Sequence, residues 1–171
     1  MSTPVQTKEA LNVSVRPVRE TDLAEARRIF RVAFGTFMHV PDPESFAADQ
    51  EYIFTRWRTD PSAALAAEVD GNLVGTNFLA HWGSFGLFGP LTVRPELWDQ
   101  HVAQALLAPT VDLFDKWGVR EAGLFTFSNS PKHLALYQKF GFWARFLTPI
   151  ISISSRLIER VRSFVRVQVD P

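Results

Sequence analysis

The spacing of apolar side chains predicts a strand and two helices in the first third of the chain. Apolar and polar residues alternate over "NVSVRPV", residues 12–18, as in a half-buried strand. "TDLAEARRIFRVAF", residues 21–34, begins with a capping Thr21 and acidic residues, as a helix does. One face of that helix is apolar: Leu23, Ala26, Ile29, Phe30, Ala33 and Phe34. "GTFMHVPDP" is expected to break it, and "ESFAADQEYIFTRWR", residues 44–58, is expected to form a second helix.

The middle of the chain reads as strands followed by a helix. Two apolar runs in residues 63–82 meet at Asp70-Gly71 or Gly71-Asn72, and either pair is a strong signal for a tight hairpin turn. "GSFGLFGPLTV", residues 83–93, is uncharged and is expected to be a strand buried on both faces. Residues 99–117 read as a helix that is interrupted by Pro109 and ends at Gly118.

The last third adds a strand, a helix and another strand. "EAGLFTF", residues 121–127, predicts a short buried strand. "SPKHLALYQKFG" has the start and stop signals of a helix, with Ser130 as N-cap, Pro131 at the first position and Gly141 just past the end. "FWARFLTPIISIS", residues 142–154, predicts a last strand. Residues 1–11 are expected to be a loose tail, and residues 155–171 an amphipathic extension that is either helix or strand.

This order of elements predicts an α/β (α+β) domain, in which helices cover a mixed sheet. We expect a twisted, mostly antiparallel sheet of six to seven strands with about four helices on its faces. The chain of 171 residues is long enough for one such domain, and its hydrophobic share of 46% is that of a folded globular protein.

Composition narrows the class of protein. The formal net charge is zero, so nothing draws the protein as a whole to nucleic acid. The absence of Cys excludes disulfides and thiolate nucleophiles, and it fits a cytoplasmic protein. Residues 73–93 lack formal charge but hold too many Gly and polar residues for a membrane helix, and the N-terminus does not resemble a signal peptide. We therefore expect no nucleic-acid partner and no membrane partner.

Two motifs carry the candidate chemistry. "LTVRPELWDQHVAQALL", residues 91–107, is a strand that stops at a proline and turns into a helix, a junction that often binds phosphate. "SNSPKHLALYQKFGF", residues 128–142, contains a helix that ends in Tyr-x-Lys-x-Gly-Phe. Together they resemble the two signatures of the GNAT superfamily, the Gcn5-related N-acetyltransferases, in the expected order and separation. The resemblance covers residues 12–154 and implies an acyltransferase domain that uses acetyl-CoA as co-substrate.

The first signature departs from the family pattern in its loop. Its glycine positions fall on His101 and Ala103, and its Arg or Gln position falls on Trp98. In the family this loop binds the CoA pyrophosphate mainly through backbone N–H groups at the helix N-terminus. Such donors do not depend on their side chains, so they survive if His101 takes an ordinary helical φ. We expect the acyl-CoA site to include the following residues of this loop: Trp98, Asp99, Gln100, His101, Val102, Ala103 and Gln104.

The resemblance adds contacts for the pantetheine arm. The family's fourth strand splays from the fifth, and Leu91 and Val93 hold the positions whose backbone pairs with pantetheine. Gly89 and Pro90 predict an interrupted hydrogen-bond ladder there. Ser130 is either a purely structural cap or a hydrogen-bonding partner of the pantetheine amide. Trp98 either packs beside the loop or flanks the adenine or pantetheine.

Two residues are candidates for catalysis. The resemblance places Tyr137 beside the thioester sulfur, where a phenol with a pKa near 10 can donate to the leaving thiolate; the alternative is a packing tyrosine. His81 ends a strand, and its ordinary pKa of about 6.5 suits a general base, although a lone histidine there is more often just polar. His39, His133 and Glu68 are weaker candidates. No spacing of His, Asp or Glu suggests a metal site.

The expected function is transfer of an acetyl group from acetyl-CoA to an amine of a small molecule. Transfer is expected to be direct, in a ternary complex, because there is no Cys to carry the acyl group. The alternative is a non-catalytic GNAT-like module that binds acyl-CoA or another ligand. A homodimer is left open. An apolar acceptor pocket can draw on these residues, most of which are expected to be core: Phe34, Phe37, Met38, Phe85, Phe88, Phe125 and Phe127.

Overall fold

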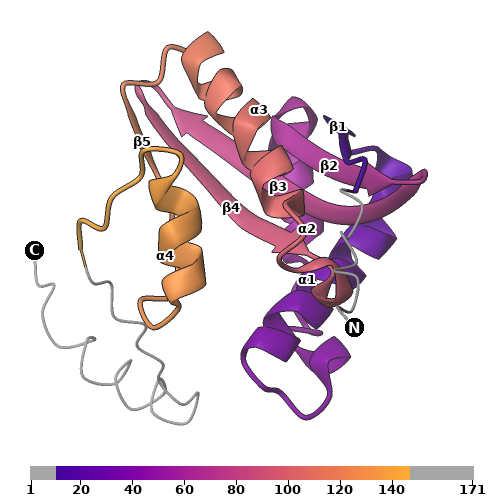
Figure 1. The fold of residues 1–171 in the computed structure, drawn as a ribbon. Helices are drawn as coiled ribbons and strands as arrows, with labels where there is room; N and C mark the ends of the chain where they lie inside the picture. Colours follow the sequence, from indigo (N-terminus) through magenta and orange to yellow (C-terminus); the bar gives the residue numbers. More distant parts are fainter. Residues whose placement is uncertain (1–10, 147–171) are drawn as a thin grey trace, which may run out of the picture.

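A five-stranded sheet forms the centre of the molecule (Figure 1). The structure is a computed structural model and describes residues 11–146. The strands lie side by side in chain order: β1 (Ser14–Pro17), β2 (Ala64–Val69), β3 (Asn72–Trp82), β4 (Phe85–Val93) and β5 (Glu121–Gly123). The first three pairings are antiparallel and only β4 with β5 is parallel. The mixed, mostly antiparallel sheet is thus confirmed.

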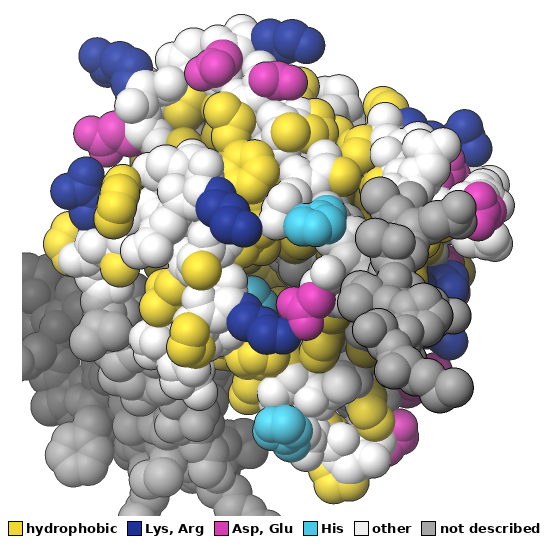
Figure 2. All heavy atoms as spheres, in the orientation of Figure 1, with side chains coloured by type: hydrophobic (Ala, Val, Ile, Leu, Met, Phe, Trp, Pro, Cys, Tyr) yellow, Lys and Arg dark blue, Asp and Glu magenta, His cyan; other side chains and the backbone are white. Residues whose placement is uncertain are grey.

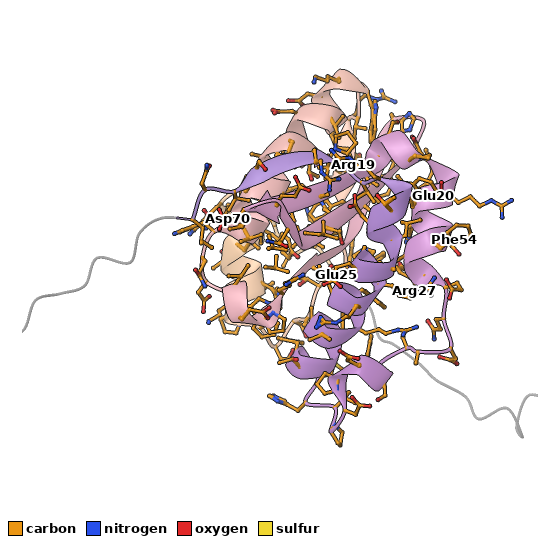
Figure 3. All side chains as sticks on the ribbon, turned by 90° about the vertical axis from the view of Figure 1, so that its right-hand side faces the viewer. Arg19, Glu20, Glu25, Arg27, Phe54 and Asp70 are labelled. Atoms are coloured by element: carbon orange, nitrogen blue, oxygen red, sulfur yellow. The ribbon has the colours of Figure 1, made fainter. Side chains whose placement is uncertain are left out.

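Four helices cover the two faces of the sheet (Figures 1 and 3). They are α1 (Leu23–Phe37), α2 (Tyr52–Thr59), α3 (Val102–Lys116) and α4 (Pro131–Gln138). The side view shows α1 and α2 on one side, where Arg27 and Phe54 mark them, and α3 on the other. No helix of residues 11–146 is long and apolar enough to cross a membrane.

Strand β2 separates two hydrophobic cores because its side chains alternate between the faces. Leu65 and Ala67 join the core under α3, which also holds Leu106 and Tyr137. The intervening residues of β2, Ala64 and Ala66, join the core under α1 and α2, together with Ile29, Ile53 and Phe78. Burial on both sides explains why "ALAA" is apolar without alternation.

The expected number of strands is too high for the described residues, which hold five. The predicted strand 121–127 pairs only over Glu121–Gly123. Residues 142–146 of the predicted last strand are not extended into the sheet, and its remainder lies outside the described residues, as do residues 1–10 and the C-terminal extension. Strand β4 alternates between buried and half-buried positions, so it is not uniformly buried as predicted.

Two helix boundaries also differ from the prediction. Helix α1 continues through Gly35 to Phe37, and its N-cap is Asp22 and not Thr21. Gly35 lies under the following loop, where an added Cβ would come within 2.5 Å of the carbonyl oxygen of Pro43, so glycine permits this contact. The predicted helix 44–58 is shorter, because Pro43–Ser45 forms a 3-10 turn and Ala47 has a positive φ of 49°. Regular α-helix begins only at Tyr52.

The predicted hairpin is confirmed at its turn. Asp70 and Gly71 both have positive φ, 50° and 76°, as the tight turn between β2 and β3 requires. The irregularity expected at Gly89 and Pro90 is also present. The pairing of β3 with β4 shifts register between Asn77 and Leu79, opposite this dipeptide.

Strand β4 loses its outer neighbour halfway along. Its pairing with β5 runs from Phe85↔Glu121 to Leu87↔Gly123 and then stops. Within the described residues the outer edge of β4 is therefore unpaired from Phe88 to Val93, and the sheet opens there. This opening faces the N-terminal end of α3 (Figure 1).

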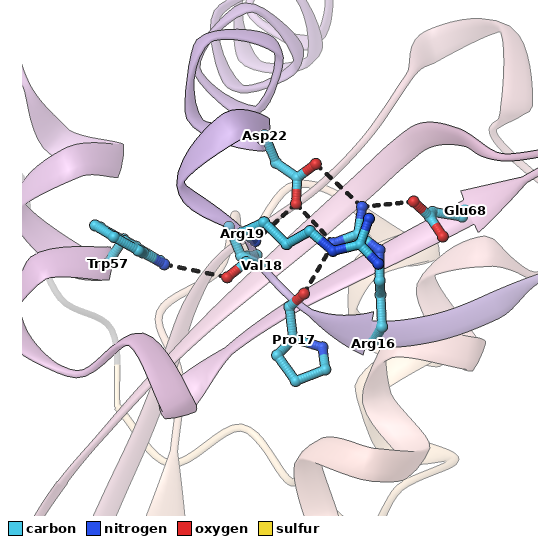
Figure 4. A network of polar contacts seen from close by, with 7 residues as sticks. All are labelled: Arg16, Pro17, Val18, Arg19, Asp22, Trp57 and Glu68. Carbon is cyan, nitrogen blue, oxygen red and sulfur yellow. Dashed lines mark hydrogen bonds and ion pairs between the residues drawn. The ribbon is translucent and has the colours of Figure 1, made fainter.

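An ion-pair network fixes the start of α1 to the edge of the sheet (Figure 4). The guanidinium of Arg16, on β1, donates to Asp22 at 2.6 Å and to Glu68 on β2. Asp22 also accepts the backbone N–H of Arg19 at 2.7 Å. These hydrogen bonds to Arg16 lower the pKa of both carboxyls. Glu68 is thus an ion-pair partner within the fold.

Asp22→Asn is expected to lower stability at neutral pH by about 1–2 kcal/mol, because charge-assisted hydrogen bonds to Arg16 are lost. A carboxyl with a depressed folded-state pKa stabilises above its unfolded pKa of about 3.9 and loses that contribution as pH falls through the folded value. The difference in melting temperature between wild type and variant should therefore shrink below about pH 4. Asp112→Asn, at an exposed position on α3, is the control. An equal difference at pH 3 and pH 7 would contradict the role of the Asp22 charge.

Candidate active site

A cavity of about 460 Å³ lies where the open edge of β4 meets the start of α3. Its other walls are α4 and the C-terminal part of α1. Figure 2 shows a hollow on this face, with hydrophobic side chains inside and basic, acidic and histidine side chains around it. The cavity brings together all but Gln100 of the ten residues predicted to contact acyl-CoA: Leu91, Val93, Trp98, Asp99, His101, Val102, Ala103, Gln104 and Ser130.

The start of α3 presents free backbone donors to this cavity. The first helical hydrogen bond runs from the N–H of Ala105 to the carbonyl of His101 at 3.0 Å. The N–H groups of Val102, Ala103 and Gln104 precede that bond, and no acceptor for them occurs among the described residues. All three residues line the cavity. A helix N-terminus of this kind favours an anion.

His101 does not meet the condition stated for it, an ordinary helical φ. His101 lies in the left-handed region, with φ 65° and ψ 4°, and Asp99 has φ 61°. The place where the family has glycine thus keeps a conformation suited to glycine, although a side chain occupies it. The left-handed conformation accompanies the sharp turn that the chain makes between Trp98 and Val102, where α3 begins. Histidine and aspartate tolerate this region better than most residues do.

His101→Gly is expected to leave acetyl-CoA binding intact or improve it, since the backbone donors stay in place and a Cβ is removed. The variant should also gain up to about 1 kcal/mol of stability, because the left-handed strain of a side-chain-bearing residue disappears while glycine adds some unfolded-state entropy. Calorimetric titration with acetyl-CoA and thermal denaturation measure the two effects. A large loss of affinity would mean that the imidazole itself is the contact.

The open edge of β4 offers backbone groups to the same cavity. Arg94 donates its N–H to the carbonyl of Val74 on β3 at 2.9 Å. Alternation in an antiparallel ladder then turns the backbone groups of Leu91 and Val93 away from β3, toward the open edge. The indole of Trp98 donates to the carbonyl of Val93 at 2.9 Å. Trp98 therefore fixes the loop to the strand. The backbone N–H of Val93 and the backbone N–H and carbonyl of Leu91 face the opening.

Side chains of the loop divide between the cavity and solvent. Asp99 accepts a hydrogen bond from the ammonium of Lys132, the second residue of α4, at 2.6 Å. This exposed ion pair connects the two walls of the cavity at its mouth. Lys139, one helical turn beyond Ala135, also lines the cavity and adds positive charge. Gln100 instead donates to the carbonyl of Glu96 at 3.0 Å and does not line the cavity.

Helix α4 contributes Ser130 and His133 to the cavity wall. Ser130 occupies the N-cap position and is 8% exposed, but its hydroxyl makes no capping hydrogen bond. The hydroxyl is thus not used as a cap. His133 packs edge-on against Phe37, with ring centroids 5.0 Å apart, and its Nδ1 is buried without a partner among the described residues. Burial lowers the pKa of His133, so the imidazole is neutral at pH 7.

Tyr137 lies one turn beyond His133 but inside the core. It is 8% exposed, its ring centroid is 5.8 Å from that of Phe88, and it is not part of the cavity wall. Burial raises the pKa of Tyr137 to about 12, and an interaction with the side chain of Thr126 opposes this shift. The phenol therefore keeps its proton throughout the neutral range. Its ring packs in the core as the packing interpretation expects.

The structure does not bring His81 to this cavity. His81 is exposed at the far end of β3, pairs with Gly86 near the β3–β4 turn and stacks on Trp117 at 5.0 Å. The cavity adjoins the opposite end of β4, at Leu91 to Val93. His39 is exposed just after α1 and lines no cavity described here. His133, ranked below His81 from the sequence, is the better placed of these histidines.

A second cavity of about 530 Å³ adjoins the first half of the open edge. Its walls are α1, the loop before α2, helix α2, residues 87–90 of β4 and Phe125 after β5. Phe34 lines both cavities and Phe88 lines the second. The two cavities thus lie along consecutive parts of one strand, 87–90 and 91–93, on either side of the Phe34 ring.

Sequence reasoning did not find the polar residues of the second cavity. Asp49, Gln50, Tyr52 and Arg56 line it, and all belong to the segment predicted as one continuous helix. No motif in that segment distinguishes them. For His133 a signal was available, because Ser130, His133 and Tyr137 are spaced three and four residues apart and so share a helix face.

Comparison with known proteins identifies the family of this chain. The profile of the Acetyltransferase (GNAT) family matches residues 23–142, which is more than half of the chain. A search of curated proteins gives no match. A GNAT family acetyltransferase from Brucella melitensis, solved with acetyl-CoA, is 22% identical with a TM-score of 0.58, and the match covers 78% of this chain and 84% of that one.

Two further solved structures share the fold. The paia N-acetyltransferase from Thermoplasma acidophilum, solved with coenzyme A, is 19% identical with a TM-score of 0.61, over 79% of this chain and 92% of that one. A protein of Pyrococcus horikoshii is 18% identical with a TM-score of 0.67, over 81% and 94%. The chain therefore belongs to the GNAT family of acetyltransferases, whose members are acyltransferases.

Proposed function

We propose that this protein transfers an acetyl group from acetyl-CoA to the amine of a small molecule, by direct transfer within a ternary complex. One observation carries the proposal: a single cavity joins the free N–H groups at the start of α3 to the open edge of β4. The first can bind a pyrophosphate, and the second can pair with the amides of a pantetheine arm.

The charges around the cavity fit such a co-substrate. Lys132 and Lys139 stand at its wall on α4, and the N-terminus of α3 adds a partial positive charge. Asp99 is the acidic residue in the wall, and Lys132 holds it in an ion pair. An arriving phosphate can therefore share Lys132 with Asp99, whose negative charge the ammonium continues to balance.

The reaction needs two proton movements. The ammonium of the acceptor must first lose a proton, and its nitrogen then attacks the thioester carbonyl. When the tetrahedral intermediate collapses, the carbon–sulfur bond breaks and the thiolate takes up a proton. His133, neutral at pH 7, is our candidate to accept the first proton. Tyr137, protonated throughout the neutral range, is our candidate to supply the second, which requires the ring to reach the sulfur once acetyl-CoA is bound.

The test compares binding with turnover. Purified protein is first heated with and without acetyl-CoA, and release of free CoA is then followed with a panel of primary amines. The proposal expects thermal stabilisation by acetyl-CoA and steady CoA release that depends on the amine, with acetylated amine found by mass spectrometry. Stabilisation without amine-dependent release would overturn it.

A non-catalytic acyl-CoA-binding module is the second candidate. The burial of Tyr137 behind Phe88, away from the cavity wall, favours it specifically. Such a module would bind acetyl-CoA through the same backbone groups but would not accelerate acetylation. The binding and turnover test described above separates the two candidates. Acetyl-CoA should stabilise the protein in both cases, but only an enzyme should show turnover.

A further inference from the structure

The second cavity has a wall of aromatic rings. Phe34 and Phe46 stack at 5.6 Å with an interplanar angle of 10°, and Phe30 stacks on Tyr52 at 5.8 Å and 18°. Phe46 also meets Phe30 edge-on at 5.9 Å. These four rings come from α1, the loop before α2 and the first residue of α2. Offset and edge-on ring contacts of this kind favour a further aromatic group as the next neighbour.

Two charged residues line the cavity, and one of them is already engaged. Arg56 donates to the hydroxyl of Tyr52 at 2.8 Å and lies over its ring, 5.1 Å from the centroid. Asp49 has no salt bridge among the described residues. Arg56 keeps its positive charge in this arrangement, because the Tyr52 hydroxyl is neutral. The carboxylate of Asp49 is therefore the group of this cavity that attracts a cation.

The position of the cavity connects it to the reaction. Its β4 wall, residues 87–90, continues directly into residues 91–93. These residues line the first cavity, which we call the donor cavity because acetyl-CoA is proposed to bind there, and Phe34 lines both cavities. A molecule held against the rings can therefore direct one end along β4 toward an acetyl group in the donor cavity. This end must carry the nucleophile.

We propose that the second cavity is the acceptor site and that it takes an arylalkylamine, a primary amine on a short chain attached to an aromatic ring. This inference rests on the proposed acetyltransferase function. The ring packs among Phe30, Phe34 and Phe46, and Asp49 attracts the ammonium form as it arrives. After that group loses a proton, its nitrogen forms the new bond to the acetyl carbon, the bond to sulfur breaks, and CoA leaves as the thiol.

The experiment measures kcat/KM for 2-phenylethylamine, ethylamine and spermidine at saturating acetyl-CoA. We expect 2-phenylethylamine to exceed the other two by at least about 10-fold, because only it fills the aromatic wall. Phe46→Leu should reduce that preference by about 10-fold, mainly through KM. Phe54→Leu is the matched control, since Phe54 is a phenylalanine of α2 that does not line the cavity, and it should change nothing.

Asp49→Asn tests the charge separately. We expect KM for 2-phenylethylamine to rise about 3-fold at low salt with kcat unchanged, and the difference to vanish at high salt. Asp112→Asn is the control. The proposal is overturned if ethylamine or spermidine is the better substrate, or if the preference survives in Phe46→Leu. Those outcomes leave the acetyltransferase function standing, whereas stabilisation by acetyl-CoA without turnover of any amine would overturn both.

Discussion

Ala103→Pro is expected to weaken acetyl-CoA binding by about 10- to 100-fold. Proline removes one backbone N–H, and a hydrogen bond to a charged group contributes about 1.5–3 kcal/mol. The N–H of Ala103 has no acceptor in the described structure, so the substitution breaks no bond of the helix itself. Proline is tolerated best at the very start of a helix, so a modest stability cost accompanies the change at this second position.

The control for this prediction is Ala103→Ser, which keeps the N–H and should bind acetyl-CoA nearly as wild type does. Isothermal titration of both variants gives the comparison, and thermal denaturation without ligand checks that each is folded. Equal affinities for the two variants would mean that the backbone at this position does not hold the pyrophosphate.

Tyr137→Phe is expected to lower turnover about 10²-fold, the low end for the loss of a general acid. The ring and its packing against Phe88 are kept and only the interaction with Thr126 is lost, so stability should fall by at most about 1 kcal/mol and acetyl-CoA affinity should change little. Because the pKa of Tyr137 is raised to about 12, wild-type activity should show no loss from this group between pH 7 and pH 10.

The readout for Tyr137→Phe is a single-turnover rate with a competent amine, so that chemistry and not product release is measured. Tyr137→Ala is unsuitable as a test, because removing a buried ring costs about 3–5 kcal/mol of stability by itself. A wild-type single-turnover rate in Tyr137→Phe would assign the residue to packing alone.

The sequence predicted best where a local signal has a single structural meaning. Asp70-Gly71 forms the predicted turn because positive φ at two successive positions is what that dipeptide permits. Ser130, Pro131 and Gly141 bracket α4 closely, although Gly141 lies three residues past its last helical residue, Gln138. Most of the residues that line the first cavity were also predictable, since they lie in the two motifs, whereas its wall on α1 was not predicted to belong to this cavity.

The sequence failed where tertiary contacts decide. Gly35 looked like a helix breaker, yet α1 continues through it because packing against Pro43 outweighs the low helix propensity of glycine. His81 looked like a candidate base because a histidine ends the strand there, but its place on β3 puts it at the far end of β4 from the first cavity. The second cavity was predictable only in part: Phe34, Phe88 and Phe125 were named for an apolar pocket and line it, but its polar residues come from a segment without a motif.

The contact between Gly35 and Pro43 has a consequence for the evolution of substrate range. The loop that begins at Pro43 carries Phe46 and Asp49, and only the missing methyl group at position 35 allows it to lie so close to α1. An alanine there would push this backbone outward and widen the space between Phe34 and Phe46. If the second cavity holds the acceptor as proposed, a single codon change at position 35 would therefore be enough to alter the size of the acceptor that fits.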